Sequence, residues 1–227
     1  MNEKHHRTIR SFVKRQGRMT QGQTRALESL MPDYGIDHVE GVLDYQSLFG
    51  RDAATVLEIG FGMGQSLVTQ ADSHPEINYL GIEVHLPGVG ALLNAMEEKG
   101  LENIRVSGED AVEVLRDHIA DDSLDGIQIF FPDPWHKKRH HKRRLIKPEF
   151  VKALSRKLRP GGFMHLATDW ENYAEQMLEV LTAENLLANT SETDDYVPRP
   201  DSRPLTKFEQ RGHRLGHGVW DLYFLRK

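Results

Sequence analysis

Short apolar runs that alternate with helix-like patterns limit the fold of this 227-residue chain more than any other feature. We expect strands near residues 55–59, 77–83, 104–106, 124–131 and 162–168. Strands that are joined by helical crossovers pair in parallel, and helices then cover both faces of the sheet. The alternation therefore predicts an α/β protein with a Rossmann-like, doubly wound, mostly parallel sheet.

Two helices and the domain organisation follow from local signals. One helix is expected at residues 148–158 and ends at a Pro-Gly-Gly sequence, and another at about residues 172–187. Residues 1–50 form a basic, then mixed leader, an N-terminal arm with a short lead-in helix that ends near Pro32. Residues 51–227 are long enough for one domain with a single substantial core.

A glycine-rich turn follows the first expected strand, in the sequence VLEIGFGMG. Gly60, Gly62 and Gly64 allow a sharp turn and a close approach of the backbone to a ligand. Such a turn alone also fits a nicotinamide dinucleotide fold or a structural bend. Glu58 would repel a pyrophosphate, whereas it would attract a sulfonium or an amino group. The turn therefore favours a cofactor other than a dinucleotide.

Acidic residues follow further strands. Glu83 ends the second expected strand nineteen residues after Gly64, where a carboxylate commonly binds ribose hydroxyls. Asp110 follows the third strand, and Asp133 follows the fourth. Each acid alone could cap a helix or a turn. Because parallel strands end at one edge of a sheet, the acids together predict a ligand site at that edge.

The fourth strand ends in the sequence FPDPWHKKRHHKRR. Pro132 and Pro134 fix the backbone around Asp133 and remove two backbone donors. Six Lys and Arg side chains follow within residues 136–144. A carboxylate beside a phosphate-binding run suggests chemistry on a nucleic acid. Without the glycine-rich turn, the same stretch would also fit a proline-terminated strand with a solvated basic loop.

These motifs resemble those of the bacterial tRNA (guanine-N7-)-methyltransferase family, which uses S-adenosyl-L-methionine. RSFVKRQGRMT at residues 10–20, ATDW at 167–170 and RPLTKFEQRG at 203–212 extend the resemblance over nearly the whole chain. It implies a seven-stranded sheet with an antiparallel terminal strand at residues 219–225. It also implies methyl transfer to N7 of guanosine in the tRNA variable loop, conventionally position 46.

The resemblance and the chemistry of N7 suggest roles for individual residues. N7 of guanine already presents a lone pair, so the reaction needs no general base. Asp133 is the predicted catalytic residue, which would stabilise developing positive charge and orient the base. Trp135 could stack on a base or pack internally. The residues assigned to cofactor binding are Glu58, Gly60, Gly62, Gly64, Glu83 and Asp110. The residues assigned to tRNA are Lys137, Arg139, His140, His141, Lys142, Arg143, Arg144, Asp169, Thr206, Lys207, Phe208 and Glu209.

Two acids are candidates for choosing the base. Asp169 or Glu209 could accept hydrogen bonds from N1–H and the N2 amino group of guanine, a pattern that adenine lacks. The alternatives are an N-cap for Asp169 and a solvent-facing loop acid for Glu209. Residues 194–217, rich in Pro, Arg and Asp, are expected to form a long substrate loop.

Composition limits the remaining possibilities. The chain has no cysteine, which excludes disulfides, thiolate zinc sites and a thiol nucleophile. The histidines lack carboxylates or thiols at ligand spacing, so no metal is expected. No signal peptide or apolar span is visible, which predicts a cytoplasmic protein without a membrane partner. The net charge is −5, which alone argues against indiscriminate binding of nucleic acid. Residues 1–20, however, hold six Lys and Arg against one acid, so tRNA remains the expected partner. The protein is expected to be a monomer or a homodimer.

Three other functions compete with this one. A nicotinamide-dependent oxidoreductase would bind NADH, but Glu58 and the GxGxG spacing argue against it. A catalytically silent tRNA-binding or chaperoning protein would bind tRNA but not S-adenosylmethionine. An amino-group methyltransferase is suggested by Asp133-Pro134-Trp135, which loosely resembles the Asp/Asn-Pro-Pro-aromatic motif of those enzymes.

Overall fold

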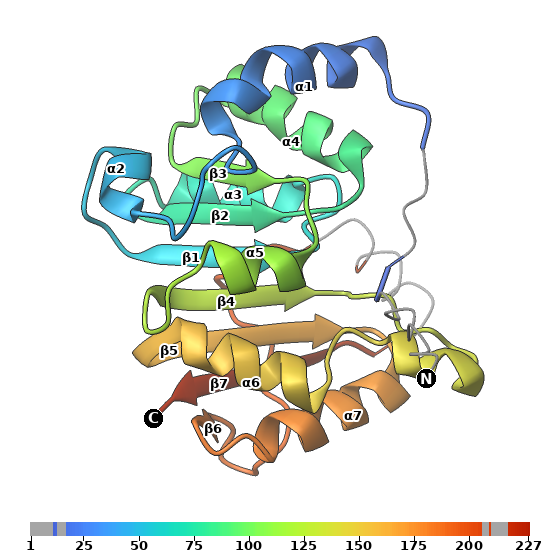
Figure 1. Cartoon of the computed structure of the whole chain (residues 1–227). Helices are drawn as coiled ribbons and strands as arrows, with labels where there is room; N and C mark the ends of the chain where they lie inside the picture. Colours follow the sequence, from blue (N-terminus) through green and yellow to red (C-terminus); the bar gives the residue numbers. More distant parts are fainter. Residues whose placement is uncertain (1–10, 13–16, 206–208, 210–217) are drawn as a thin grey trace, which may run out of the picture.

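A seven-stranded sheet forms the centre of the computed structural model, which describes residues 11–12, 17–205, 209 and 218–227 (Figure 1). The strand order is β3-β2-β1-β4-β5-β7-β6. The strands are β1 Thr55–Ile59, β2 Asn78–Ile82, β3 Ile104–Ser107, β4 Leu124–Phe130, β5 Leu158–Thr168, β6 Leu187–Asn189 and β7 Trp220–Arg226. Strands β1 to β5 pair in parallel, and β7 pairs antiparallel with β5 and β6. This confirms the predicted fold class.

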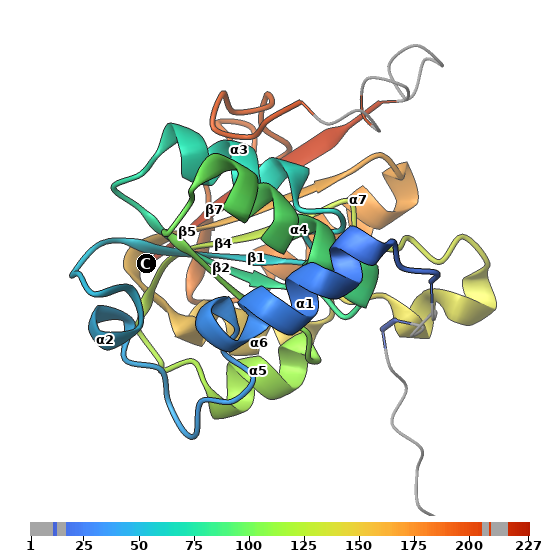
Figure 2. The same cartoon turned by 90° about the horizontal axis from the view of Figure 1, so that it is seen from above.

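Helices cover both faces of the sheet, with α3 on one side and α5 and α6 on the other (Figure 2). The helices are α1 Gln21–Tyr34, α2 Tyr45–Phe49, α3 Gln65–Ser73, α4 Leu86–Lys99, α5 Ala111–Asp117, the 3-10 helix η1 Lys138–Arg143, α6 Pro148–Lys157 and α7 Glu171–Thr182. One apolar cluster joins α5, α6 and α7 to the sheet, and a second joins α1, α3 and α4 to it. Because both faces are covered, every residue of β1 and β2 is buried.

The predicted strands and the two placed helices are present, with three differences. Helix α7 ends at Thr182 and is followed by the short strand β6, which the sequence prediction missed. Strand β5 begins at Leu158, directly after α6, so the expected Pro-Gly-Gly stop lies inside the strand. Helix α1 continues through Pro32 to Tyr34, because the proline falls in the last turn and displaces few backbone hydrogen bonds.

The described part of residues 1–50 packs on the sheet domain. Ala26 of α1 is fully buried in the cluster that contains α4. The Ile36 amide donates to the Val106 carbonyl of β3 (3.0 Å). Leu43 belongs to the other apolar cluster. The lead-in helix therefore contributes to the core of the domain.

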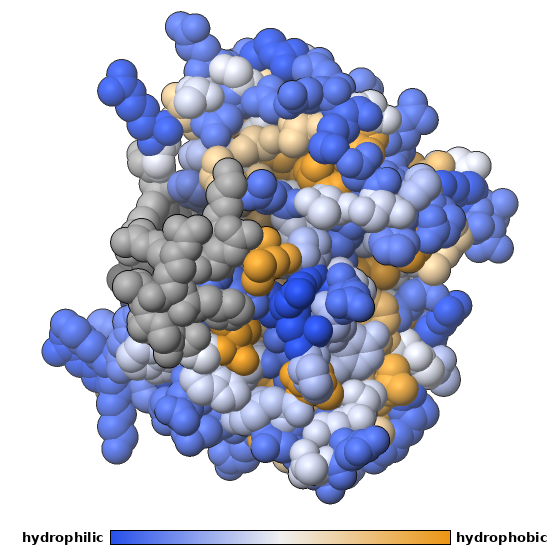
Figure 3. Space-filling model, turned by 180° about the vertical axis from the view of Figure 1, so that it is seen from behind, coloured by the Kyte–Doolittle hydropathy of each residue, from blue (hydrophilic) through white to orange (hydrophobic). Residues whose placement is uncertain are grey.

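The molecular surface is mainly polar. Figure 3 shows polar side chains over most of one face, with apolar side chains in separate patches. Within the described part of the chain, every helix is too short or too polar to cross a lipid bilayer.

Candidate active site

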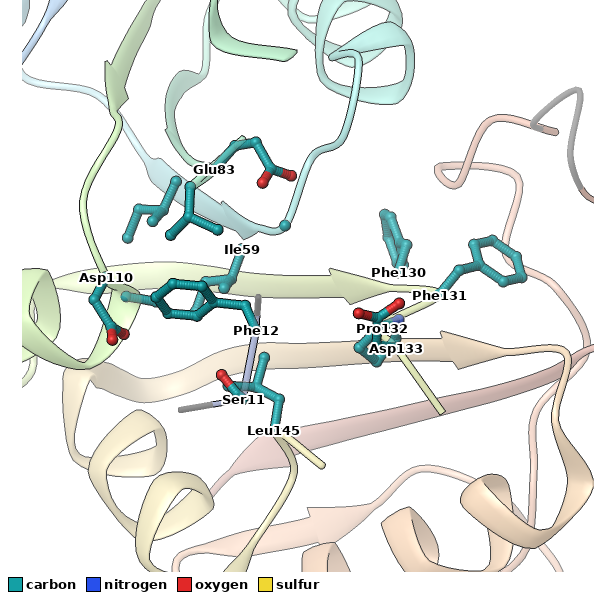
Figure 4. Close-up of a pocket in the computed structure, with 14 residues that line it drawn as sticks. Ser11, Phe12, Ile59, Glu83, Asp110, Phe130, Phe131, Pro132, Asp133 and Leu145 are labelled. Atoms are coloured by element: carbon teal, nitrogen blue, oxygen red, sulfur yellow. The ribbon is translucent and has the colours of Figure 1, made fainter. Parts of the chain in front are cut away.

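A cavity of about 240 Å³ lies where the parallel strands end. Residues from the ends of β1, β2 and β4 and from the start of α5 line it. Glu83, Asp110 and Asp133 surround this cavity, as Figure 4 shows. The structure thus brings three of the four predicted strand-end acids together at the expected edge.

The glycine-rich turn uses backbone conformations that favour glycine. Gly60, Gly62 and Gly64 have φ values of 77°, 60° and 78°. A Cβ on Gly64 would lie 2.9 Å from Leu92, so this glycine permits close packing of α4. Only Gly60 lines the cavity, and a Cβ there would meet no atom within 4 Å. Gly60 therefore leaves open space beside the backbone, into which a ligand can fit.

Glu83 is held in place by two backbone donors. The Gly62 amide donates to Oε2 and the His85 amide donates to Oε1, each at 2.9 Å. These bonds fix the carboxylate at the cavity and attach it to the glycine-rich turn. Each oxygen has a further lone pair, which can accept a hydrogen bond from a ribose hydroxyl.

Asp110 combines the two roles that the sequence left open. Its Oδ1 accepts a hydrogen bond from the Val112 amide (3.0 Å), so it is the N-cap of α5. The same residue lines the cavity. The hydrogen bond of the cap orients the carboxylate. Asp110 is only half-buried, so its carboxylate stays within reach of a ligand.

Glu58 lies elsewhere than predicted. Its side chain is 2% exposed and does not line the cavity; its Oε2 accepts a hydrogen bond from Gln70 Nε2 (3.4 Å). Burial raises the pKa of Glu58 to about 8, so the side chain is mainly neutral at pH 7. The predicted attraction between a Glu58 charge and a cationic cofactor is therefore not supported by this geometry.

Asp133 lies at the boundary between the first cavity and a second one of about 500 Å³. Both cavities are lined by Phe12, Glu83, Val84 and Asp133. The backbone around Asp133 is unusual, because Phe131 and Trp135 have positive φ values of 51° and 49°. Such conformations are costly for non-glycine residues and persist only where the surrounding structure supports them. The turn presents the exposed Asp133 side chain to both cavities.

Residues of the N-terminal arm complete the site. Ser11 and Phe12 line the first cavity, and the ring of Phe12 lies there between the sheet and α5 (Figure 4). Trp135 Nε1 donates to the Ser11 carbonyl (3.2 Å). This role was not predicted from the sequence. The only signal was the resemblance of residues 10–20 to a family motif, which indicates no contact with the strand ends.

Trp135 also joins the second cavity to the basic run. The Arg143 guanidinium carbon lies 4.9 Å from the centre of its ring, and His140 makes an edge contact at 6.0 Å. The Trp135 side chain is half-buried between these groups. Trp135 therefore packs against its neighbours and, together with Lys137, also lines the second cavity.

The basic run divides into exposed cations and one buried cation. Lys137, Arg139 and Lys142 are exposed, in or next to η1. Arg144 is 1% exposed, and its guanidinium donates to the Pro134 carbonyl (2.9 Å), and to Asn172 and Gln176 of α7. The prediction that Arg144 contacts phosphate is wrong, because its hydrogen bonds attach the run to the protein.

The two base-reading candidates differ in their surroundings. Asp169 is half-buried after β5, and it is not the N-cap of α7, since that position belongs to Trp170. Trp170 contacts His136, which lines the second cavity, with ring centres 4.2 Å apart. Glu209 is buried, and both of its oxygens accept hydrogen bonds from Arg203 (2.7 and 2.8 Å). It is therefore no solvent-facing acid, whereas Asp169 stays partly exposed.

Two further predictions meet limits of the described chain. Thr206, Lys207 and Phe208 lie outside the described residues. Among the residues that are described, no three His, Asp or Glu side chains gather closely enough to hold a metal ion.

Comparisons with known proteins agree with this fold. A family model described as "Putative methyltransferase" matches residues 52–222. The structure of the 16S rRNA methyltransferase KamB aligns with a TM-score of 0.58 and 17% identity, over 84% of this chain and 97% of that one. The seven-stranded sheet, the glycine-rich turn and the carboxylate that follows β2 define an S-adenosylmethionine-dependent methyltransferase.

Closely similar sequences identify the family. A tRNA (guanine-N(7)-)-methyltransferase of Pseudoalteromonas translucida is 61% identical over 98% of this chain and 92% of its own length. Those of Idiomarina loihiensis and Aeromonas hydrophila are each 62% identical, over 97% of this chain and 90% and 93% of their lengths. The chain belongs to the tRNA (guanine-N7-)-methyltransferase family.

Proposed function

We propose that this chain transfers the methyl group of S-adenosylmethionine to N7 of guanosine in the tRNA variable loop, at position 46. The position of Asp133 carries this proposal, because its carboxylate lies where a cavity suited to the cofactor meets one lined by aromatic and basic side chains. A methyl group can pass only between reactants that meet, and these two cavities meet at Asp133.

Three features would hold the cofactor. Glu83 would accept hydrogen bonds from ribose hydroxyls, since backbone donors already fix its orientation. Gly60 would admit the cofactor close to the backbone. Asp110, at the start of α5, would contact a polar group at the other side of the cavity. When bound, S-adenosylmethionine supplies an electrophilic methyl group.

Asp133 would act without exchanging a proton. The lone pair of guanine N7 would form the new bond to the methyl carbon, and the electrons of the carbon–sulfur bond would stay on sulfur. The purine gains a positive charge during this step. A carboxylate beside it stabilises that charge and aligns the base, and no general base is required.

The second cavity and the surface beside it would bind tRNA. Arg139 and Lys142 are exposed cations that suit phosphates, and Lys137 reaches the cavity itself. Asp169 would accept hydrogen bonds from N1–H and the N2 amino group of guanine. Thr206, Lys207 and Phe208 stay assigned to tRNA on the resemblance alone.

The proposal is tested by locating the product. Unmodified tRNA is incubated with the protein and S-adenosylmethionine, digested to nucleosides and examined by mass spectrometry. We expect 7-methylguanosine, and sequencing of the tRNA should place it in the variable loop. A methyl group on an exocyclic amine would support amino-group methylation instead, and tRNA binding without any methylation would support a chaperone.

A further inference from the structure

A buried group of charged side chains lies beneath the turn that carries Asp133. Arg203 is 1% exposed, and its guanidinium makes two bonds to Asp221 of β7: Nε to Oδ1 at 2.7 Å and Nη2 to Oδ2 at 2.9 Å. It makes two more to Glu209, from Nη1 at 2.7 Å and Nη2 at 2.8 Å. His165 Nε2 lies 2.8 Å from the same Asp221 Oδ1. We refer to Arg203, Glu209, Asp221 and His165 as the buried charge cluster.

The buried charge cluster contacts the aromatic end of β4. The guanidinium carbon of Arg203 lies 5.9 Å from the ring centre of Phe130 and 5.5 Å from that of Phe131. Both distances fall within the range of cation–π attraction, which is strongest where water is excluded. Phe131 has a φ of 51°, a conformation that needs support from its surroundings. Its amide also donates to the Ala167 carbonyl of β5 (2.8 Å).

The residues that precede Glu209 make further contacts around Arg203 and β7. The Arg203 carbonyl accepts a hydrogen bond from Arg199 Nη1 (2.7 Å), and Val197 pairs with Asp221 on β7. Arg203 therefore connects three parts of the chain: the end of β4, strand β7 and Glu209. Two of these parts carry residues assigned to catalysis or to tRNA.

We infer that Arg203 is a positioning residue, which fixes the Asp133 turn through Phe131 and attaches Glu209 to that turn. This inference rests on the proposed function for its catalytic consequence. The structural part of the inference does not depend on that function: it states that the planar guanidinium of Arg203 fixes the conformation of Phe131. The planar shape matters because only a planar guanidinium can bind two carboxylates in pairs and also face two aromatic rings.

The test compares two conservative substitutions. Arg203→Lys keeps the positive charge but removes the planar, multi-donor guanidinium, so it separates the effect of hydrogen-bond geometry from that of charge. Arg51→Lys is the matched control, since Arg51 also donates to several acceptors but at the opposite edge of the sheet, on Asn78 and the Pro75 and Ile77 carbonyls. Thermal unfolding of both variants identifies a temperature at which each is fully folded, and all measurements are made there.

The first readout is activity. Arg203→Lys should lower kcat about tenfold or more, with the dissociation constant of S-adenosylmethionine changed less than about twofold, because Glu83, Gly60 and Asp110 lie outside the buried charge cluster. Arg51→Lys should change neither. The second readout is amide hydrogen exchange of Phe131, which should be about tenfold faster in Arg203→Lys than in Arg51→Lys.

The two readouts together decide whether Arg203 fixes the Asp133 turn and whether activity depends on that turn. Equal kcat and equal Phe131 exchange in the two variants would overturn the inference. Faster exchange with an unchanged kcat would overturn the catalytic part, because Asp133 would then not depend on the turn. If the unsubstituted protein formed no 7-methylguanosine, the proposed function would fail, and the exchange comparison would still decide whether Arg203 fixes the turn.

Discussion

Replacement of Glu58 by glutamine should make the protein more stable, increasingly so as pH rises. Burial raises the pKa of Glu58 from its ordinary value of 4.5 to about 8. A carboxyl group with a raised pKa stays protonated in the folded protein, whereas the unfolded chain releases the proton. Stability is therefore lost as pH rises from about 4.5 to about 8, and the loss is complete above the folded-state value.

The size of the effect follows from the same values. Each unit of pKa difference corresponds to about 1.4 kcal/mol, so the cost is about 3 kcal/mol at pH 7 and between about 4 and 5 kcal/mol at pH 9. Glutamine has no charge to release, and its shape matches the protonated acid. Gln128 Oε1, on the register partner of Glu58, is a buried acceptor without a donor among the described residues, and a glutamine amide can donate to it.

Thermal unfolding from about pH 5 to pH 9 checks this prediction. The melting temperature of Glu58→Gln should exceed that of the unsubstituted protein by on the order of 10 °C at pH 8, with a small difference at pH 5. Glu102→Gln, at an exposed carboxylate, is the control and should follow the unsubstituted protein at every pH. Two parallel curves for Glu58→Gln and the unsubstituted protein would refute a neutral, buried Glu58.

Three further predictions concern the site. Asp133→Asn should lower kcat by about 100-fold or more while S-adenosylmethionine affinity stays within about tenfold, measured by single-turnover kinetics and calorimetry; near-normal turnover would remove Asp133 from the mechanism. Glu83→Gln should weaken S-adenosylmethionine binding by about 1 to 3 kcal/mol, and an unchanged calorimetric constant would place the ribose elsewhere. Alanine at both Arg139 and Lys142 should reduce the slope of log affinity for tRNA against log salt by about 1 to 2; Lys99→Ala, a surface cation paired with an acid, should not.

The sequence predicted the sheet well, because its evidence was local. Each strand of the parallel core is a short apolar run that ends in a turn residue, and that pattern needs no knowledge of distant contacts. The strand β6 was missed because three residues, Leu187–Asn189, carry too little pattern to separate them from the end of a helix. Its pairing with β7 decides its structure.

The site was predicted in part for the same reason. Glu83 directly follows β2 and Asp133 lies three residues after β4, so the chain places both at the sheet edge with little freedom. Glu58 lies inside its strand, where the alternation of side chains directs neighbouring residues to opposite faces, and Ile59 lines the cavity instead. Phe12 reaches the cavity through a contact between residues more than a hundred positions apart, which no local pattern encodes.

Arg144 changes how losses of activity in this region should be interpreted. Its guanidinium attaches the basic run to α7 and to the Pro134 carbonyl, one residue after Asp133. An alanine at this position removes a support of the Asp133 turn and leaves the exposed cations in place. Loss of activity in an Arg144 variant is thus evidence about the shape of the turn. An alanine scan that ranks these arginines by activity alone would mistake this structural residue for an RNA contact.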